Sequence, residues 1–102
     1  MTVRDVPERH RYEIHDGEQR VGLSTYKLTD DTITFIHTEV DPAFGGRGLA
    51  KQLVEFELDD ARRRGLAVLP SCPYVRKVIA ENPTAYLDLV PAPERARFDL
   101  PD

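Results

Sequence analysis

The segment TEVDPAFGGRGLA, residues 38–50, decides the fold of this chain. It reads as the end of an apolar strand, a short turn, a glycine-rich loop and the start of an amphipathic helix. Such a loop turns several backbone N–H groups toward one point, where the free N–H groups and the positive dipole end of the helix favour an anion. Glycine allows close approach of a ligand to the backbone, and Arg47 adds a permanent cation. The segment therefore predicts a phosphate or pyrophosphate cradle.

The residues before this segment predict an antiparallel meander. Asp16-Gly17 and Asp30-Asp31 mark turns between segments of strand character. The alternation of apolar side chains slips between Leu23 and Tyr26, which indicates a bulge or burial on both faces. The expected strands cover residues 11–15, 19–28 and 32–40.

The residues after the loop predict a helix, a parallel strand and a second helix. Apolar spacing predicts the first helix from about Gly46 to Arg64, capped by Gly65. The short apolar run 66–69 predicts a buried strand parallel to the strand that ends at Val40, and residues 74–81 predict the second helix. The acidic residues of the first helix are expected largely outside its apolar stripe: Glu55, Glu57, Asp59 and Asp60. The arginines at its end, Arg62, Arg63 and Arg64, suit helix capping better than DNA contact.

These elements together predict a mixed α/β (α+β) fold. The domain organisation that we expect is a flexible N-terminal arm over residues 1–9, a folded domain over residues 10–90 and a tail over residues 91–102. Three prolines and scattered charges from Pro91 onward indicate that the tail has no core of its own.

Composition excludes several classes of function. The net charge of −4 argues against a general nucleic-acid binder, because no positive excess is present to displace counterions. No apolar run approaches the roughly 20 residues of a membrane span, and the N-terminal residues show no secretory signal. One cysteine allows no internal disulfide, so a cytoplasmic protein is expected. His10 and His15 lack the partners of a zinc site, so no metal is expected.

Five motifs occur in the order and spacing of a known superfamily. The chain resembles the GNAT acyltransferases, and within them the short, single-domain YjdJ-type branch, over about residues 12–90. The motifs are His37-Thr38-Glu39-Val40, Gly46-Arg47-Gly48-Leu49-Ala50, Leu53-Val54, Cys72-Pro73-Tyr74-Val75 and Tyr86-Leu87-Asp88-Leu89-Val90. Gly45 stands where the loop of the superfamily usually begins with Arg or Gln.

The resemblance implies acetyl-CoA or a related acyl-CoA as the bound molecule. The pyrophosphate would be held by the loop and helix start, which here are Gly45, Gly46, Arg47, Gly48, Leu49 and Ala50. Backbone groups of Thr38, Glu39 and Val40 would pair with the pantetheine amides as another strand would. The alternative interpretation is a plain strand-to-helix turn, whose glycines only relieve backbone strain.

Two side chains are candidates for catalysis. Cys72 follows the second parallel strand and precedes a helix, where a thiolate is stabilised, so it could accept the acetyl group or line the thioester pocket. His37 could act as a general base, although alternation places it on one face with Ile33, Phe35 and Glu39, as a core histidine would lie. For Cys72 the alternative is a small buried residue. Glu39 is a weaker base candidate. Tyr74 and Tyr86 could protonate a departing thiolate, but both also fit helix packing.

The function expected from these features is acetyl-CoA-dependent transfer of an acetyl group to an unidentified amine, on a protein or a small molecule. The developing oxyanion would be stabilised by backbone N–H groups. The alternative is a catalytically silent acyl-CoA-binding module. A nucleotide-phosphate binder is disfavoured because the Lys-Ser/Thr pair of a P-loop is absent. No nucleic-acid or membrane partner is expected.

Overall fold

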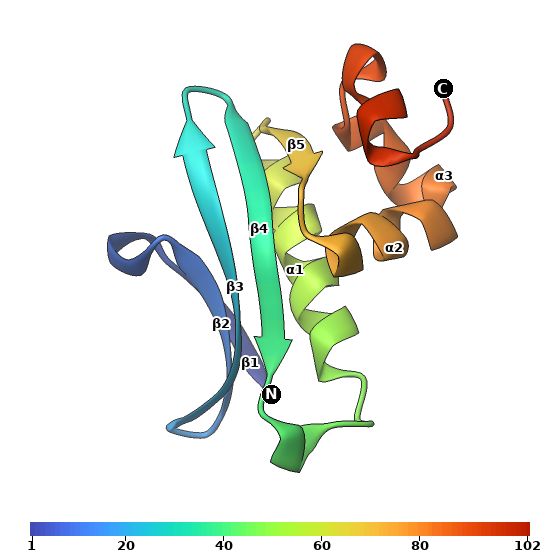
Figure 1. The fold of residues 1–102 in the computed structure, drawn as a ribbon. Coiled ribbons are helices and arrows are strands. Elements are labelled where there is room, and N and C mark those ends of the chain that lie inside the picture. The colour runs from blue at the N-terminus through green and yellow to red at the C-terminus, as the bar shows by residue number, and fades with distance from the viewer.

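A five-stranded sheet forms the centre of the computed structural model, which describes all 102 residues (Figure 1). Neighbouring strands of the meander pair antiparallel, whereas the last strand pairs parallel to its neighbour. The strands lie in the sheet in chain order: β1 (Thr2–Val6), β2 (Arg11–Asp16), β3 (Gln19–Thr29), β4 (Thr32–Val40) and β5 (Ala67–Pro70). The predicted meander, the parallel strand and the mixed α/β fold class are confirmed.

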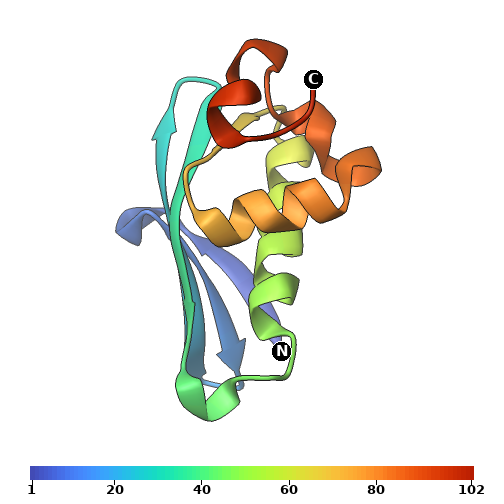
Figure 2. The ribbon, with the colours of Figure 1, turned by 45° about the vertical axis from the view of Figure 1, so that its right-hand side comes forward.

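The α-helices lie against one face of the sheet (Figure 2). Helix α1 begins three residues later than predicted, because Gly46 and Gly48 have φ angles of +78° and +72°, outside the right-handed helical region. Gly65, with φ +69°, stops the chain from continuing α1, as predicted. The helices are α1 (Leu49–Arg63), α2 (Pro73–Glu81) and α3 (Pro83–Tyr86), and short 3-10 turns follow α3. None of these helices has the length and apolar character needed to cross a membrane.

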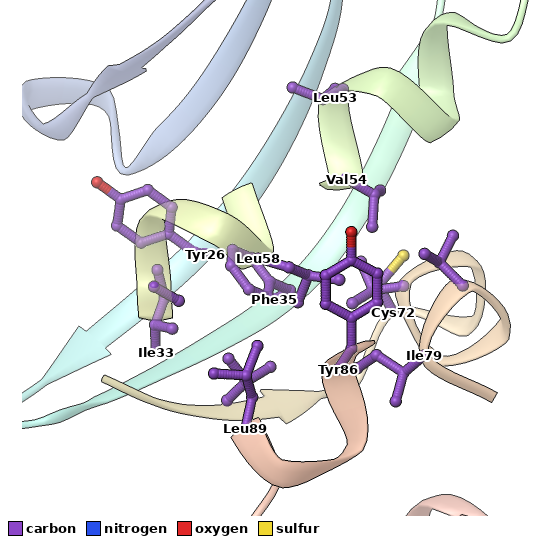
Figure 3. Packing of buried hydrophobic residues seen from close by; sticks show 14 of the residues in the cluster. Tyr26, Ile33, Phe35, Leu53, Val54, Leu58, Cys72, Ile79, Tyr86 and Leu89 are labelled. Atoms are coloured by element: carbon purple, nitrogen blue, oxygen red, sulfur yellow. The ribbon is translucent and has the colours of Figure 1, made fainter. Parts of the chain in front are cut away.

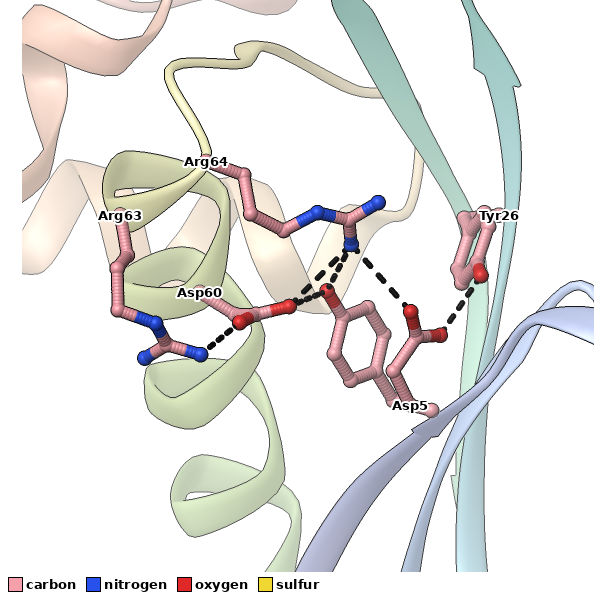
Figure 4. A network of polar contacts seen from close by, with 6 residues as sticks. Asp5, Tyr26, Asp60, Arg63 and Arg64 are labelled. Atoms are coloured by element: carbon pink, nitrogen blue, oxygen red, sulfur yellow. Dashed lines mark hydrogen bonds and ion pairs between the residues drawn. The ribbon is translucent and has the colours of Figure 1, made fainter.

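The N-terminal residues form strand β1, and the prediction of a flexible arm there is wrong. Strand β1 pairs antiparallel with β2 along its whole length, from Thr2↔His15 to Val6↔Arg11. The reason is a polar network between sheet and helix that local sequence does not reveal (Figure 4). Asp5 accepts a hydrogen bond of 2.7 Å from the Tyr26 hydroxyl and one of 3.3 Å from Arg64, so β1 is tied to both β3 and the end of α1.

Asp60 is the centre of that network. Its carboxylate accepts hydrogen bonds from the buried Tyr12 hydroxyl and from Arg63, and a further one of 3.3 Å from Arg64. Arg62, the third arginine at the end of α1, forms hydrogen bonds of 2.7 and 2.9 Å with the carboxylate of Asp88. Arg62 and Arg64 therefore tie the end of α1 to other elements, and Arg63 pairs with Asp60 on the same helix, which agrees with the structural interpretation of the triplet.

We expect Asp60→Ala to destabilise the protein by about 2–3 kcal/mol, because it leaves the buried Tyr12 hydroxyl without an acceptor. Asp60→Asn keeps one carbonyl oxygen and should cost less. Urea unfolding of the three proteins measures the difference. A cost below about 0.5 kcal/mol for Asp60→Ala, as at an ordinary surface position, would show that these hydrogen bonds do not stabilise the fold.

The C-terminal residues also pack on the body of the protein. Phe98 and Leu100 are buried and join the main hydrophobic cluster, although the sequence predicted a tail without a core of its own. The Arg76 guanidinium of α2 lies 5.9 Å from the centre of the Phe98 ring. Burial in the main cluster, and for Phe98 the contact with Arg76, places these side chains, and no periodic pattern near them predicts it.

The core lies between the sheet and the helices, and residues of α2 and of the C-terminal turns belong to it. Figure 3 shows the packing of part of this cluster. Two acidic residues of α1 are part of this buried face. Glu57 is 0% exposed and Asp60 is 6% exposed, so the prediction that they lie outside the buried stripe is wrong. Helical spacing explains it, since Glu57 follows Leu53 by four residues and precedes Ala61 by four.

Candidate active site

A β-bulge in β4 determines which side chains reach the helix side of the sheet. Thr25 pairs with His37, and the next residue, Tyr26, pairs with Phe35, so Ile36 has no partner. Alternation reverses at such an extra residue. The slip expected near Tyr26 is confirmed, but the extra residue lies on β4. Thr38 therefore points toward the helices, whereas His37 is turned to the opposite face.

Strand β4 has a free edge beyond the bulge. Its parallel pairing with β5 runs from Thr32↔Ala67 to Phe35↔Pro70 and ends there. The Cys72 N–H then donates to the Phe35 carbonyl at 2.8 Å, which holds the start of α2 against β4. The rest of β4, Ile36–Val40, has β3 on one side and no strand on the other. This edge leaves backbone groups free to pair with an extended ligand.

The glycine loop leads from this edge to α1. Asp41 caps the turn after β4, because its carboxylate accepts a hydrogen bond of 2.9 Å from the Ala43 N–H. None of the backbone N–H groups from Gly46 to Lys51 donates a hydrogen bond within the protein. A Cβ atom placed on Gly46 or Gly48 would meet nothing within 4 Å, so the space above both glycines is open. These free donors surround the start of a long helix, where an anion is favoured.

Arg47 lies in the same loop. Its guanidinium is 5.0 Å from the centre of the Phe44 ring, and it forms no ion pair with a carboxylate of the chain. No acidic residue occupies the first turn of α1. The loop therefore combines free N–H groups with a cation whose charge is not neutralised.

A series of polar side chains runs from α1 to Cys72 through β3 and β4. The Ser24 hydroxyl donates to Glu57 Oε2 at 3.1 Å. The Ser24 and Thr38 hydroxyl oxygens are 3.3 Å apart, and Thr38 Oγ1 is 3.4 Å from Cys72 Sγ. The bulge is what makes this series continuous, because it turns Thr38 to the helix side.

Glu57 lies at the buried end of this series. Its Oε1 atom is buried without any hydrogen-bond partner. The pKa of its carboxyl is raised well above the usual range, mainly by burial. The hydrogen bond from Ser24 lowers this pKa, and the charge interaction with Cys72 raises it. Neither Glu57 nor Ser24 was predicted from the sequence as a site residue. The spacing of Glu57 among Leu53, Leu58 and Ala61 was the available signal.

The structure does not bring the two predicted catalytic residues together. Cys72 is 3% exposed and packs among apolar side chains on the helix side (Figure 3). The His37 side chain is 60% exposed on the other face and forms a hydrogen bond of 3.0 Å with Glu39. The alternative that His37 is a core histidine is therefore wrong, because the bulge reverses the alternation that placed it beside Phe35.

The two tyrosines lie where packing predicts them. Tyr86 is buried in the hydrophobic cluster that contains Cys72, and Tyr74 packs against that cluster while half-buried. Burial raises the pKa of both hydroxyls, so both are protonated at neutral pH. Neither forms a side-chain hydrogen bond within the chain.

The larger surface hollows lie away from the thiol. One of about 410 Å³ borders the ends of β3 and β4 and is lined by Gly22, Val40 and Asp41 among others. Another, of about 510 Å³, includes Arg4 and Glu13. No group of three or more His, Cys, Asp or Glu side chains is placed to hold a metal ion.

A family model for the GCN5-related N-acetyltransferases matches residues 11–89, which include the whole site described above. The chain belongs to this family. A GCN5-like candidate N-acetyltransferase from Staphylococcus aureus, solved by NMR, superposes on this GCN5-related protein with a TM-score of 0.65 and 25% identity. The match covers 88% of this chain and 87% of that one. The resemblance inferred from the motifs is thus confirmed at the level of the superfamily.

Several vertebrate proteins are similar in sequence to this chain, over between about half and four fifths of its length. Protein NATD1 of Xenopus tropicalis is 40% identical over 52 residues, which are 51% of this chain and 48% of that protein. Protein NATD1 of Homo sapiens is 43% identical over 47 residues, 46% of this chain and 42% of that protein. In these matches the chain spans about half of the relative's length. Protein NATD1 of Danio rerio is 36% identical over 96 residues, 81% of this chain and 86% of that protein.

Proposed function

We propose that this GCN5-related protein binds acetyl-CoA and transfers the acetyl group to an amine, of a protein or a small molecule. The observation that carries the proposal is the run of free N–H groups from Gly46 to Lys51 beside the unpaired edge of β4. Family membership supports acetyl-CoA as the anion that this cradle accepts. We also propose the cytoplasm as its location, since its single cysteine forms no disulfide.

The residues of the cradle fit the two halves of the cofactor. The N–H groups of the loop and helix start suit a pyrophosphate, together with Arg47. The free edge at Thr38, Glu39 and Val40 suits the two amides of a pantetheine arm, as a strand would pair. A pantetheine arm that lies along this edge toward Phe35 would reach the place where the Phe35 carbonyl accepts the hydrogen bond from the Cys72 N–H.

Cys72 is then the side chain best placed to meet the acetyl group. Its thiol lies at the start of α2, at the point where the pairing of β4 with β5 ends. As a thiolate it could form an acetyl thioester, which the amine then cleaves; as a thiol it would orient the acyl group. His37, on the opposite and open face, is available only to an acceptor that approaches from that side.

A catalytically silent acyl-CoA-binding module is the second candidate. The observation in its favour is that Cys72 is 3% exposed, so an acceptor amine has little direct access to the sulfur. In such a module the cradle would bind acetyl-CoA and the thiol would only line the pocket.

Two measurements separate these functions. Thermal shift with acetyl-CoA and with ATP tests the ligand, and we expect stabilisation by acetyl-CoA only; preference for ATP would end the acyltransferase proposal. Intact mass after rapid quench with acetyl-CoA tests the covalent route. We expect one acetyl adduct on the protein and none on Cys72→Ala. Binding without adduct, and without acetylation of any amine supplied, would favour the silent module.

A further inference from the structure

The contacts of the Glu57 carboxyl group give it no evident role in stabilising the fold. It is 0% exposed, one of its oxygens is bonded only by Ser24, and the other oxygen has no partner. Burying a carboxyl with an unsatisfied oxygen destabilises a protein, and an apolar side chain of similar size would avoid that cost. A buried titratable group that is connected to a thiol through hydroxyl groups is a candidate for a catalytic role.

We propose that Glu57 is the proton acceptor of the Cys72 thiol, acting through the hydroxyl groups of Thr38 and Ser24. This inference rests on the proposed function and extends it. The contacts of 3.4, 3.3 and 3.1 Å form one continuous path from Cys72 Sγ to Glu57 Oε2. Its last bond already has the direction that transfer requires, since Ser24 donates to Glu57.

The proton moves by a shift along this path. The Cys72 S–H proton passes to Thr38 Oγ1, the Thr38 hydroxyl proton passes to Ser24, and the Ser24 proton passes to Glu57 Oε2. Each hydroxyl loses one proton and gains one, so the net change is a thiolate at Cys72 and a neutral carboxyl at Glu57. The total charge of the pair does not change.

Acetylation then balances with acetyl-CoA as the donor. The thiolate sulfur forms a bond to the acetyl carbon, the thioester bond of acetyl-CoA breaks, and CoA leaves as its thiolate. In the second half the amine nitrogen bonds the acetyl carbon, its proton goes to solvent and the Cys72 S–C bond breaks. The proton held by Glu57 returns to the sulfur by the reverse shift. Glu57 thus positions a proton and does not touch the substrate.

Burial raises the pKa of Glu57, which supports this role because its carboxylate is then a stronger proton acceptor than an ordinary carboxylate. The other titratable groups on the helix side do not compete with the pair. Asp60 is bonded to Tyr12, Arg63 and Arg64, and burial raises the pKa of the tyrosine hydroxyls that surround the core. Other titratable groups on these elements include Asp5, Glu55, Asp59, Tyr74, Arg76, Lys77, Glu81 and Tyr86, and none of them hydrogen-bonds Glu57.

The test is the pH dependence of Cys72 alkylation by iodoacetamide, in the whole protein without acetyl-CoA. Cys72 is the only cysteine, so the modification reports on this thiol alone. We expect Glu57→Gln to slow alkylation at pH 7 at least tenfold. Without the path, a mere neighbouring charge predicts the opposite sign, because removing a carboxylate lowers the pKa of a nearby thiol and speeds alkylation.

Thr38 provides a matched pair of variants. Thr38→Val removes the hydroxyl at nearly constant volume and should slow alkylation as much as Glu57→Gln. Thr38→Ser keeps the hydroxyl and should stay within about threefold of the wild type. Because the two groups act in series, the double variant Glu57→Gln/Thr38→Val should lose no more than either single variant.

Three results would overturn the proposal: faster alkylation in Glu57→Gln, equal rates for Thr38→Val and Thr38→Ser, or a wild-type thiol that reacts only as pH approaches about 8.5, as an unassisted thiol does. A different result would reject the proposed function, namely the absence of stabilisation by acetyl-CoA in the thermal shift experiment. A thiol that depends on Glu57 in a protein that ignores acetyl-CoA would keep the path and reject the acetyltransferase.

Discussion

Gly48→Leu should weaken acetyl-CoA binding about 100-fold, which corresponds to about 2.7 kcal/mol. The backbone at Gly48 has φ +72° and open space above it, so a side chain there projects into the cradle and keeps a pyrophosphate from the N–H groups. Charge-assisted hydrogen bonds contribute about 1.5–3 kcal/mol each, and the loss of one or two gives this magnitude. Isothermal titration calorimetry measures the dissociation constant.

Gly65→Leu is the matched control for this variant. Gly65 has φ +69° and nothing within 4 Å of its Cβ position, but it lies at the other end of α1. Both variants place leucine in the left-handed region, at a cost of about 1–2 kcal/mol each. We expect equal losses of stability and a loss of affinity only for Gly48→Leu. Equal affinities in the two variants would remove the cradle as the acetyl-CoA site.

Glu57→Gln should make the protein more stable than the wild type, increasingly so as pH rises. The folded-state pKa of Glu57 is raised by burial above the value of about 4.5 that it has in the unfolded chain. Below about pH 4.5 the carboxyl is protonated in both states and the two proteins should differ little. Above that pH the unfolded chain releases the proton more readily, so the wild type loses stability until pH passes the folded-state pKa.

The expected gain of the variant is up to about 1.4 kcal/mol for each pH unit in that window. Urea unfolding at about pH 4.5, 6 and 8 measures it. Asp59→Asn, at an exposed position of the same helix, is the control and should stay within about 0.5 kcal/mol of the wild type throughout. Parallel pH profiles for wild type and Glu57→Gln would mean that water or another group satisfies the carboxylate in the folded state.

Stability and the proposed chemistry therefore oppose each other at Glu57. The same variant is expected to fold better and to have a less reactive thiol. Loss of reactivity in a more stable protein cannot be attributed to unfolding, which makes Glu57→Gln the most informative substitution in this chain. Exchange of stability for activity is common at functional sites.

The elements with strong local signals were predictable from sequence. The turn at Asp16-Gly17, the β-branched run of β4, the apolar stripe of α1 and the short apolar strand β5 follow from periods of two and 3.6 residues and from turn chemistry. The glycine loop was equally clear, because positive φ angles at a strand-to-helix junction require glycine. These features depend on residues that are close along the chain.

Long-range contacts decided the rest. Strand β1 is fixed by Asp5, whose partners Tyr26 and Arg64 lie 21 and 59 residues away. The side of β4 that faces the helices changes at Ile36, an extra residue that only the pairing of β4 with β3 reveals.

The candidate site divides in the same way. Sequence alone predicted the glycine loop, which is the proposed cradle, and the position of Cys72 at the start of a helix, since both follow from local backbone geometry. Only the tertiary structure separated His37 from Cys72 and aligned Glu57, Ser24 and Thr38 with the thiol. The physical reason is that a buried polar path needs three elements packed against one another, and no local pattern encodes which polar side chains that packing brings into contact.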